Sequence, residues 1–163
     1  MVEIKKDERK VASEVQLVIF RLAQEEFGLF ISQVREIIRM QDVTPMPKAP
    51  DFIEGVINLR GQIVAVMDLA ERLSLKSGDR TEKSRIIVTE VKDNMVGLLV
   101  DEVPEVLRIA EDSIEPAPEV FDTKIHSDFI KGVGKVGKRL IILLDVDKIL
   151  SKEEIKKVGE VIK

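Results

Sequence analysis

Phe52-Ile53-Glu54-Gly55-Val56 is followed 77 positions later by a near copy of itself, Phe129-Ile130-Lys131-Gly132-Val133. The next apolar run repeats at the same spacing, since Val66-Met67-Asp68-Leu69 aligns with Leu143-Leu144-Asp145-Val146. Upstream, three more pairs match at a spacing of 69: Gly28 with Gly97, Val34 with Val103, and Ile37 with Val106. A constant register over positions that include glycine and aspartate indicates a tandem duplication.

The change of spacing from 69 to 77 places an insertion of eight residues in the second repeat, within residues 110–128. Each repeat holds five short apolar runs that are rich in valine and isoleucine and end at Gly, Pro, Asp or Asn, as strands do. These runs are 15–22, 26–31, 34–40, 56–59 and 62–68, then 85–91, 95–100, 103–109, 132–136 and 139–145. Five short strands per repeat predict an all-β protein of two small antiparallel barrels.

We expect one domain over residues 1–163, with approximate halves 15–80 for the first barrel and 84–150 for the second. The boundary lies in residues 74–83, which are polar and rich in turn formers. Short helical turns are expected at 69–73 and 146–150, and a C-terminal helix over 151–163 that Ser151 caps. A duplication in sequence leaves open whether each barrel is contiguous or the two exchange strands.

Composition excludes several classes of function. The chain has 163 residues, 44% hydrophobic and 34% charged, with one histidine and no cysteine, tryptophan or tyrosine. Thiol chemistry, disulfides and the usual zinc or copper sites are therefore ruled out or poorly supplied, and we expect no cofactor and no metal. The first ten residues mix both charges without an apolar segment, and no apolar run approaches the ~20 residues that span a bilayer.

No motif of catalysis stands out. Asp68 and Asp145 are related by the repeat, but each follows an apolar strand and precedes a helical turn, which favours helix capping over a catalytic carboxylate pair. His126 lies in the polar insertion without a nucleophile motif, and is interpreted as a loop residue. Residues 132–138 lack the spacing of a phosphate loop and are interpreted as a hairpin. The sequence predicts that the chain is not an enzyme.

The most unusual segment is 55–63, GVINLRGQI. Asn58 and Arg60 lie where two strands meet, and Gly61 supplies the positive φ that a tight turn needs. The second repeat has GVGKVG at this place, so the repeat keeps the backbone frame and changes the polar side chains. Such a difference indicates different roles for the two hairpins, with drift of surface residues as the alternative.

Residues 52–61, FIEGVINLRG, followed by the apolar run into Met67-Asp68-Leu69, resemble the hallmark of the bacterial chemotaxis coupling family CheW. Residues 27–31, 34–37, 43–47, 96–103 and 139–145 continue the resemblance, which covers about 15–150. The resemblance implies two SH3-like five-stranded barrels related by internal duplication, with a groove between them. It also implies an adaptor that couples methyl-accepting chemoreceptors to the histidine kinase CheA through its regulatory domain.

In this family the groove receives the helical hairpin at the cytoplasmic tip of a receptor. By motif position the groove falls to five residues, which are Val18, Ile31, Val34, Ile37 and Val103. The alternative is that these are core residues, and it applies most to Val18. Glu36 and Arg60 match an acidic and a basic position of the family, and we expect them to pair with each other or with the partner.

The resemblance places kinase-binding surfaces at the ends of both barrels. One falls at Val43, Thr44 and Met46, and the other near Glu115 and Val120, where this chain departs from the residues usual in the family. The expected location is the cytoplasm, at the inner face of the membrane through receptor arrays and without membrane insertion. The alternative function, a small β-barrel that binds nucleic acid, needs a basic aromatic face, and a net charge of −4 argues against it.

Overall fold

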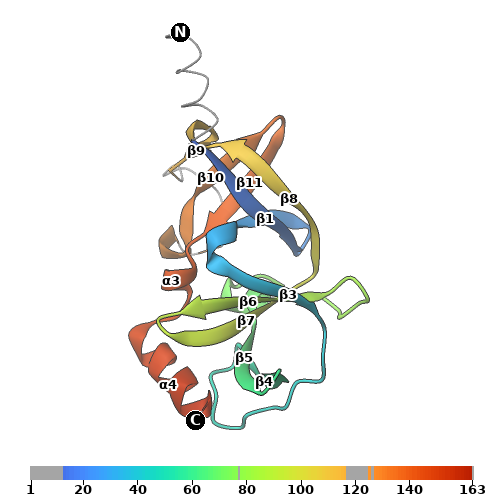
Figure 1. Ribbon diagram of the computed structural model, residues 1–163, viewed down its shortest axis with the longest axis vertical. Coiled ribbons are helices and arrows are strands. Elements are labelled where there is room, and N and C mark those ends of the chain that lie inside the picture. Colours follow the sequence, from blue (N-terminus) through green and yellow to red (C-terminus); the bar gives the residue numbers. More distant parts are fainter. Residues whose placement is uncertain (1–12, 77, 117–124, 126, 163) are drawn as a thin grey trace.

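The computed structural model describes residues 13–76, 78–116, 125 and 127–162 (Figure 1). The first repeat supplies β1 (Glu14–Leu22), β2 (Glu25–Phe30), β3 (Val34–Arg39), β4 (Ile53–Leu59) and β5 (Gln62–Asp68). The second supplies β6 (Arg85–Val91), β7 (Asn94–Val100), β8 (Glu102–Ala110), the short β9 (Ile114–Glu115), β10 (Ile130–Val136) and β11 (Arg139–Leu144). The prediction of an all-β fold with a C-terminal helix is confirmed, since α4 spans Lys152–Ile162.

The strands form two sheets, and each sheet takes strands from both repeats. The six-stranded sheet has the order β8-β1-β2-β11-β10-β9, and the five-stranded sheet has the order β3-β6-β7-β5-β4. The contiguous halves 15–80 and 84–150 therefore describe the sequence repeat and not the sheets. The sheets show the exchange that the sequence left open: the first two strands of each repeat pair with the last three of the other.

The exchange follows the repeat closely. Shifting each strand by one repeat converts β3-β6-β7-β5-β4 into β8-β1-β2-β11-β10, so the two sheets are related by a pseudo-twofold. Each sheet contains one parallel pair, in which Leu143 is opposite Gly28 and, equivalently, Val66 is opposite Gly97. A Cβ atom on Gly97 would lie 2.6 Å from Cγ2 of Ile86 on the antiparallel neighbour β6, so the packing of β6 against β7 requires glycine here.

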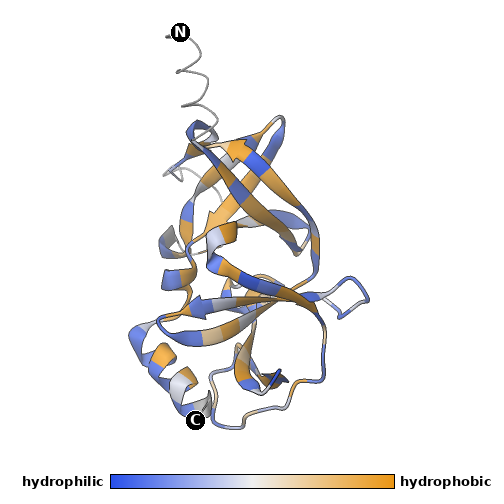
Figure 2. Ribbon diagram, in the orientation of Figure 1, coloured by the Kyte–Doolittle hydropathy of each residue, from blue (hydrophilic) through white to orange (hydrophobic). Residues whose placement is uncertain are grey.

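Each sheet curls around an apolar interior of its own, and a larger core lies between the sheets. Along β1 the side chains alternate: Leu17 and Ile19 belong to the interior of the six-stranded sheet, while Val18 and Phe20 belong to the core shared by both sheets. The five-stranded sheet encloses its own set, which includes Ile57 and Val88. Strands β1, β5 and β7 are apolar over most of their length (Figure 2), as expected of strands buried on both faces.

The helical turns begin where the sequence indicates. Asp68 accepts a hydrogen bond from the Glu71 amide and caps α2 (Leu69–Arg72), and Asp145 accepts one from the Asp147 amide and caps α3 (Val146–Ile149). Ser151 and Glu154 form a reciprocal capping box at the start of α4. The capping interpretation of both aspartates is therefore confirmed. None of the described helices has the length and apolar character that crossing a lipid bilayer requires.

The insertion in the second repeat divides into two parts. Thr44 pairs with Val56 and Glu115 pairs with Val133, so Thr44 and Glu115 are equivalent although 71 positions apart. Two of the eight extra residues therefore precede Glu115, where the single turn η2 (Glu111–Ser113) lies. The other six fall between Glu115 and Phe129. In this segment, residues 117–124 and His126 lie outside the described residues.

Candidate functional site

The edge strands β3 and β8 carry exposed apolar side chains. Ile37 on β3 is 38% exposed and Val106 on β8 is 48% exposed, and the two are equivalent in the repeat. Val34 and Val103, a second equivalent pair, are half-buried and pack against the shared core. The structure thus places two matched apolar pairs where the shared core reaches the surface.

Strand register shows which way these side chains point. Ile37 is opposite Ile87, and Val106 is opposite Val18. Ile87 and Val18 both belong to the shared core, and directly opposed residues project from the same face of a sheet. Ile37 and Val106 therefore extend the apolar surface of the shared core beyond its buried part, one from each sheet.

The other proposed groove residues divide between surface and core. Ile31, in the turn η1 (Ile31–Gln33) before β3, is 40% exposed. Val18 is only 1% exposed, so the alternative interpretation as a core residue describes it. Val106 was not among the residues selected from the sequence, although its match with Ile37 at a spacing of 69 was visible there.

Glu36 and Arg60 form a bidentate ion pair, with Nη1 of Arg60 donating to Oε1 of Glu36 at 2.9 Å and Nη2 to Oε2. The hydrogen bond from Arg60 lowers the pKa of Glu36 below its usual value, and Glu36 in turn raises the pKa of Arg60. Glu36 belongs to β3 and Arg60 to the β4–β5 turn. Since β3 and β4 are the two edges of the five-stranded sheet, the pair holds together the two ends of the curled sheet.

The six-stranded sheet has an equivalent clasp built from different residues. Arg139, at the start of β11, pairs with Glu26 on β2 at 2.6 Å and with Glu105 on β8 at 2.8 Å. Glu105 is the repeat equivalent of Glu36, but the arginine comes from a position that corresponds to Gln62. The hydrogen bond from Arg139 lowers the pKa of Glu26. Both sheets thus keep an acidic edge strand and recruit an arginine independently.

The hairpin between β4 and β5 is a two-residue turn. Leu59 is opposite Gln62, and Arg60 and Gly61 both have positive φ, 52° and 84°. The side-chain Oδ1 of Asn58 accepts a hydrogen bond from the Gly61 amide at 2.8 Å. Asn58 and Gly61 therefore fix the turn, and the turn places the Arg60 guanidinium against Glu36.

The expected kinase-binding residues lie on the outer edges of the two sheets. Thr44 is exposed and exchanges two backbone hydrogen bonds of 2.9 Å with Val56 on β4. Val43 packs against the interior of the five-stranded sheet, and Met46 is half-buried. Glu115, on β9, is exposed and pairs with Lys135 at 3.1 Å. Val120 lies outside the described residues.

Gly55 brings the Thr44 segment close to β4. Its φ is +151°, and a Cβ atom here would lie 2.0 Å from the Thr44 carbonyl oxygen. At the equivalent Gly132 a Cβ atom would lie 2.7 Å from the Glu115 carbonyl oxygen. A register shift accompanies each glycine. The repeated glycine therefore builds the same edge twice, once under Thr44 and once under Glu115.

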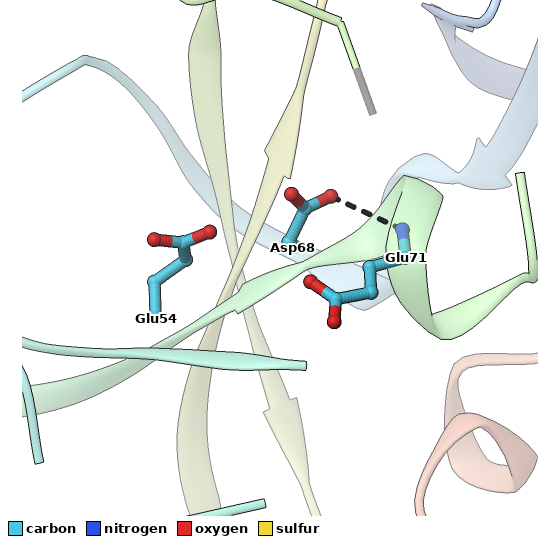
Figure 3. A group of neighbouring side chains, drawn as sticks. All are labelled: Glu54, Asp68 and Glu71. Atoms are coloured by element: carbon cyan, nitrogen blue, oxygen red, sulfur yellow. Dashed lines mark hydrogen bonds between the residues drawn. The ribbon is translucent and has the colours of Figure 1, made fainter. Parts of the chain in front are cut away.

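Three carboxylates gather near the end of β5: Glu54, Asp68 and Glu71 (Figure 3). Asp68 caps α2 through the hydrogen bond drawn there, and Arg80 from the linker pairs with Glu54 at 2.8 Å and approaches Asp68 at 3.7 Å. Burial and the neighbouring acids raise the pKa of Glu71. Asp68 thus caps α2, and Arg80 compensates part of the negative charge and attaches the linker to the end of β5.

These features are those of a protein-binding module. It consists of two strand-exchanged sheets with two equivalent outer edges. The apolar side chains at the edge of the shared core form its apolar strip, which we define as Ile31, Val34, Ile37, Val103 and Val106. Residues 16–154 match the family described as CheW-like domain. The chain therefore belongs to the CheW-like domain family, as its resemblance predicted. By family and named homologues this chain is a chemotaxis scaffold or adaptor protein rather than an enzyme, and the family implies partners in chemotaxis signalling.

Named relatives agree along nearly the whole chain. The chemotaxis protein CheW of Klebsiella aerogenes is 38% identical over 157 residues, which cover 94% of each chain. The CheW of Thermotoga maritima is 38% identical over 146 residues, covering 88% of this chain and 92% of its own. The crystal structure of the scaffolding protein TtCheW from Thermoanaerobacter tengcongensis superposes with a TM-score of 0.79 at 38% identity, covering 86% of this chain and 90% of that one.

Proposed function

We propose that this chain couples chemoreceptors to the histidine kinase CheA, with a receptor tip in the strip between the sheets and the kinase regulatory domain at the outer edges. It would act in the cytoplasm, at the inner face of the membrane where the receptors are. The observation that carries this proposal is the pair of exposed apolar residues, Ile37 and Val106, which flank the point where the shared core surfaces.

The strip suits a helical partner. Val34 and Val103 are half-buried against the shared core, and Ile31, Ile37 and Val106 remain exposed beside them. An amphipathic helix lays its apolar face into a groove of this kind. Glu36 neighbours Ile37 along β3 but is opposite Val88, so it projects from the other face of the strand, where Arg60 pairs with it. This exposed pair would set the position of β3 and contribute little affinity of its own.

The two outer edges suit a β-rich partner such as the kinase regulatory domain. Thr44 and Glu115 occupy equivalent positions in the repeat, and a glycine allows each to lie close against the strand it pairs with, β4 or β10. Their side chains differ in charge and size, and Glu115 is engaged with Lys135. Two edges with the same backbone and different side chains would bind two different surfaces of the partner.

The test compares Ile37→Asp with Leu140→Asp. Leu140 is 55% exposed, but it lies on β11, whose neighbours are β2 and β10 and not β3 or β8. Both substitutions place a charge on an exposed apolar position and are expected to leave the folded state intact. Titration calorimetry with a receptor signalling fragment and, separately, with the CheA regulatory domain measures both interactions.

The proposal predicts that Ile37→Asp weakens receptor binding at least tenfold, about 1.4 kcal/mol, without changing kinase binding. Val106→Asp should have the same effect, and Leu140→Asp should have none. Equal loss of both partners in Ile37→Asp would place Ile37 in the structural core and remove the proposed groove. Kinase activity that changes only when receptor, kinase and this protein are mixed would establish coupling.

A further inference from the structure

Arg72, the last residue of α2, lies at the junction of the two repeats. Its guanidinium carbon is 4.6 Å from the ring centre of Phe52 and 5.0 Å from that of Phe129. These phenylalanines are repeat equivalents, one directly before β4 and one directly before β10. A single cation therefore contacts both copies of the same aromatic position.

The polar atoms of Arg72 also join the repeats. Its Nε donates to the carbonyl oxygen of Ile149 at 2.6 Å, and Ile149 is the repeat equivalent of Arg72 itself. Its Nη2 donates to Glu154 of α4 at 2.8 Å, and Glu154 caps that helix through Ser151. The side chain of Arg72 is only 19% exposed. It connects α2, α3 and α4 with the segments that lead into β4 and β10.

These contacts lie beside a shared core that is apolar. Burial of apolar side chains is strong but has no preferred direction, whereas a guanidinium has a planar fork of donors and a flat face for aromatic rings. The carbonyl oxygens of Phe52 and Phe129 accept hydrogen bonds from Asp68 and Asp145, which fixes the backbone on both sides of Arg72. Contacts from both repeats therefore meet in the side chain of Arg72.

We propose that Arg72 is a positioning residue that sets the rotation of one sheet against the other, and hence the relative orientation of the two outer edges. Phe52 leads into β4, against which Thr44 pairs, and Phe129 leads into β10, against which Glu115 pairs. This inference rests on the proposed function, in which both edges bind a kinase domain.

The rotation has a consequence for assembly. A protein that binds partners head to tail through two different surfaces gives closed rings if the rotation between those surfaces closes, and open chains if it does not. Arg72 touches neither edge surface, yet it would decide between these outcomes. Its substitution is expected to spare each single interaction and to change the product of the combined one.

The geometric half of the proposal can be measured in the protein alone. The chain has no cysteine of its own, so cysteines introduced at two exposed positions are the only sites that a thiol-reactive spin label modifies. Gln62 of the five-stranded sheet and Lys138 beside the six-stranded sheet are suitable positions. Arg72→Met keeps most of the side-chain volume and removes the cation and its hydrogen bonds. Pulsed electron-spin distance measurement should show a wider distribution, or a mean shifted by about 2 Å, the scale of small shifts between packed elements.

Two further variants separate positioning from simple structural damage. Arg72→Lys keeps a cation over the rings without the fork of donors and should give an intermediate distribution. Arg85→Met is the matched control, because Arg85, at the start of β6, donates to the carbonyl groups of the nearby Glu82 and Ser84 and joins no second sheet among the described contacts. It should leave the distances unchanged. Thermal unfolding of each variant should remain a single cooperative transition.

The assembly half uses the CheA regulatory domain as the partner. Each edge is blocked in turn by substitution of Thr44 or Glu115, and Arg72→Met should bind through the remaining edge within about twofold of the unsubstituted protein. With both edges free, light scattering should show discrete particles for the unsubstituted protein and a broad distribution of sizes for Arg72→Met. If Arg72→Met leaves both the spin-label distances and the particle sizes unchanged, the proposal is overturned. It is also overturned if Arg72→Met weakens binding through a single edge as much as it disturbs assembly.

Failure of the proposed function gives a different result. If the unsubstituted protein binds no kinase domain, the coupling role is wrong, and the spin-label distances still decide whether Arg72 sets the rotation. If binding is normal and the distances of Arg72→Met superpose on those of the unsubstituted protein, the role of Arg72 is wrong and coupling stands.

Discussion

Gly55→Ala removes the close approach between the Thr44 segment and β4. The added Cβ atom would lie 2.0 Å from the Thr44 carbonyl oxygen and 2.9 Å from Cα of Pro45, distances that backbone atoms cannot accept. The φ of +151° also belongs to a region that only glycine occupies freely. Because β4 is anchored in the sheet, we expect the Thr44 segment to move away.

The magnitude follows from what is strained and what is lost. A non-glycine residue in such a conformation costs about 1–3 kcal/mol, and the two hydrogen bonds between Thr44 and Val56 contribute about 1 kcal/mol each. Gly55→Ala should therefore lower the free energy of unfolding by about 3–5 kcal/mol. For a chain of this length that corresponds to a fall in Tm of about 6–20 °C.

Chemical denaturation and amide hydrogen exchange measure this effect. The amides of Thr44 and Val56 should lose protection, because both donate across the broken edge. Gly132→Ala should cost less, since its Cβ atom would lie 2.7 Å from the nearest oxygen. Gly78→Ala is the control, because its nearest contact, to Asp101 at 3.5 Å, is ordinary, and it should change stability by no more than about 0.5 kcal/mol.

The steric argument can fail in two ways. A loss below about 1 kcal/mol in Gly55→Ala would mean that the Thr44 segment is free to shift and contributes little. Retained protection of Thr44 and Val56 alongside a large loss of stability would mean that the damage lies elsewhere. Kinase-domain binding through the Thr44 edge should fall with the lost protection, while receptor binding remains.

Two further predictions concern the sheets themselves. Gly97→Ala should lower the free energy of unfolding, measured in urea, by about 1–3 kcal/mol, and by more than Gly28→Ala. The Cβ atom at position 97 would meet the stiff β-branched side chain of Ile86 at 2.6 Å, whereas that at position 28 would meet the end of a flexible leucine at 3.0 Å. A larger loss in Gly28→Ala would refute this. Arg139→Gln should lower the free energy of unfolding at neutral pH. The difference between variant and unsubstituted protein should shrink as the pH falls below 4.5, the ordinary pKa of Glu26, because Arg139 holds that pKa down and protonation of Glu26 removes the ion pair. A difference that does not change with pH would contradict this.

Local features of the fold could be predicted from the sequence because each depends on neighbouring residues. Asp68 and Asp145 were predicted as helix caps from their place between an apolar strand and a helical turn, and both cap. The strands followed from short runs of β-branched residues. The duplication was visible because Gly55 and Gly132 serve the same purpose in both repeats, the close approach of an edge segment.

The partner of each strand could not be predicted in the same way. Apolar alternation shows which face of a strand is buried, but not which strand lies beside it. Equivalent strands of the two repeats have nearly the same pattern, so β11 could pair with β2 or with β7 on this evidence. The choice depends on the parallel contact at Gly28 and Leu143, which joins residues far apart in the chain.

The candidate site shows the same division. Motif position selects Val34 and Ile37, and the alternation at Arg35 and Glu36 weakens the interpretation of both as core residues. Val18 was selected by motif position, yet the unbroken apolar run from Leu17 to Phe20 is typical of a strand buried on both faces. The Glu36–Arg60 pair was anticipated. Its counterpart at Arg139 was not, since the two arginines occupy different places in the repeat.

Strand exchange determines when this protein can first acquire its structure during synthesis. The parallel partner of β2 is β11, so the six-stranded sheet has no complete centre until residue 144 has left the ribosome. Until then β1 and β2 can pair with each other, but β2 lacks its other neighbour, β11. Exposed strands of this kind are prone to aggregation and are substrates for chaperones. Neither repeat is thus an independent folding unit, and the six-stranded sheet is expected to be completed after the five-stranded one, whose strands all lie between Val34 and Val100.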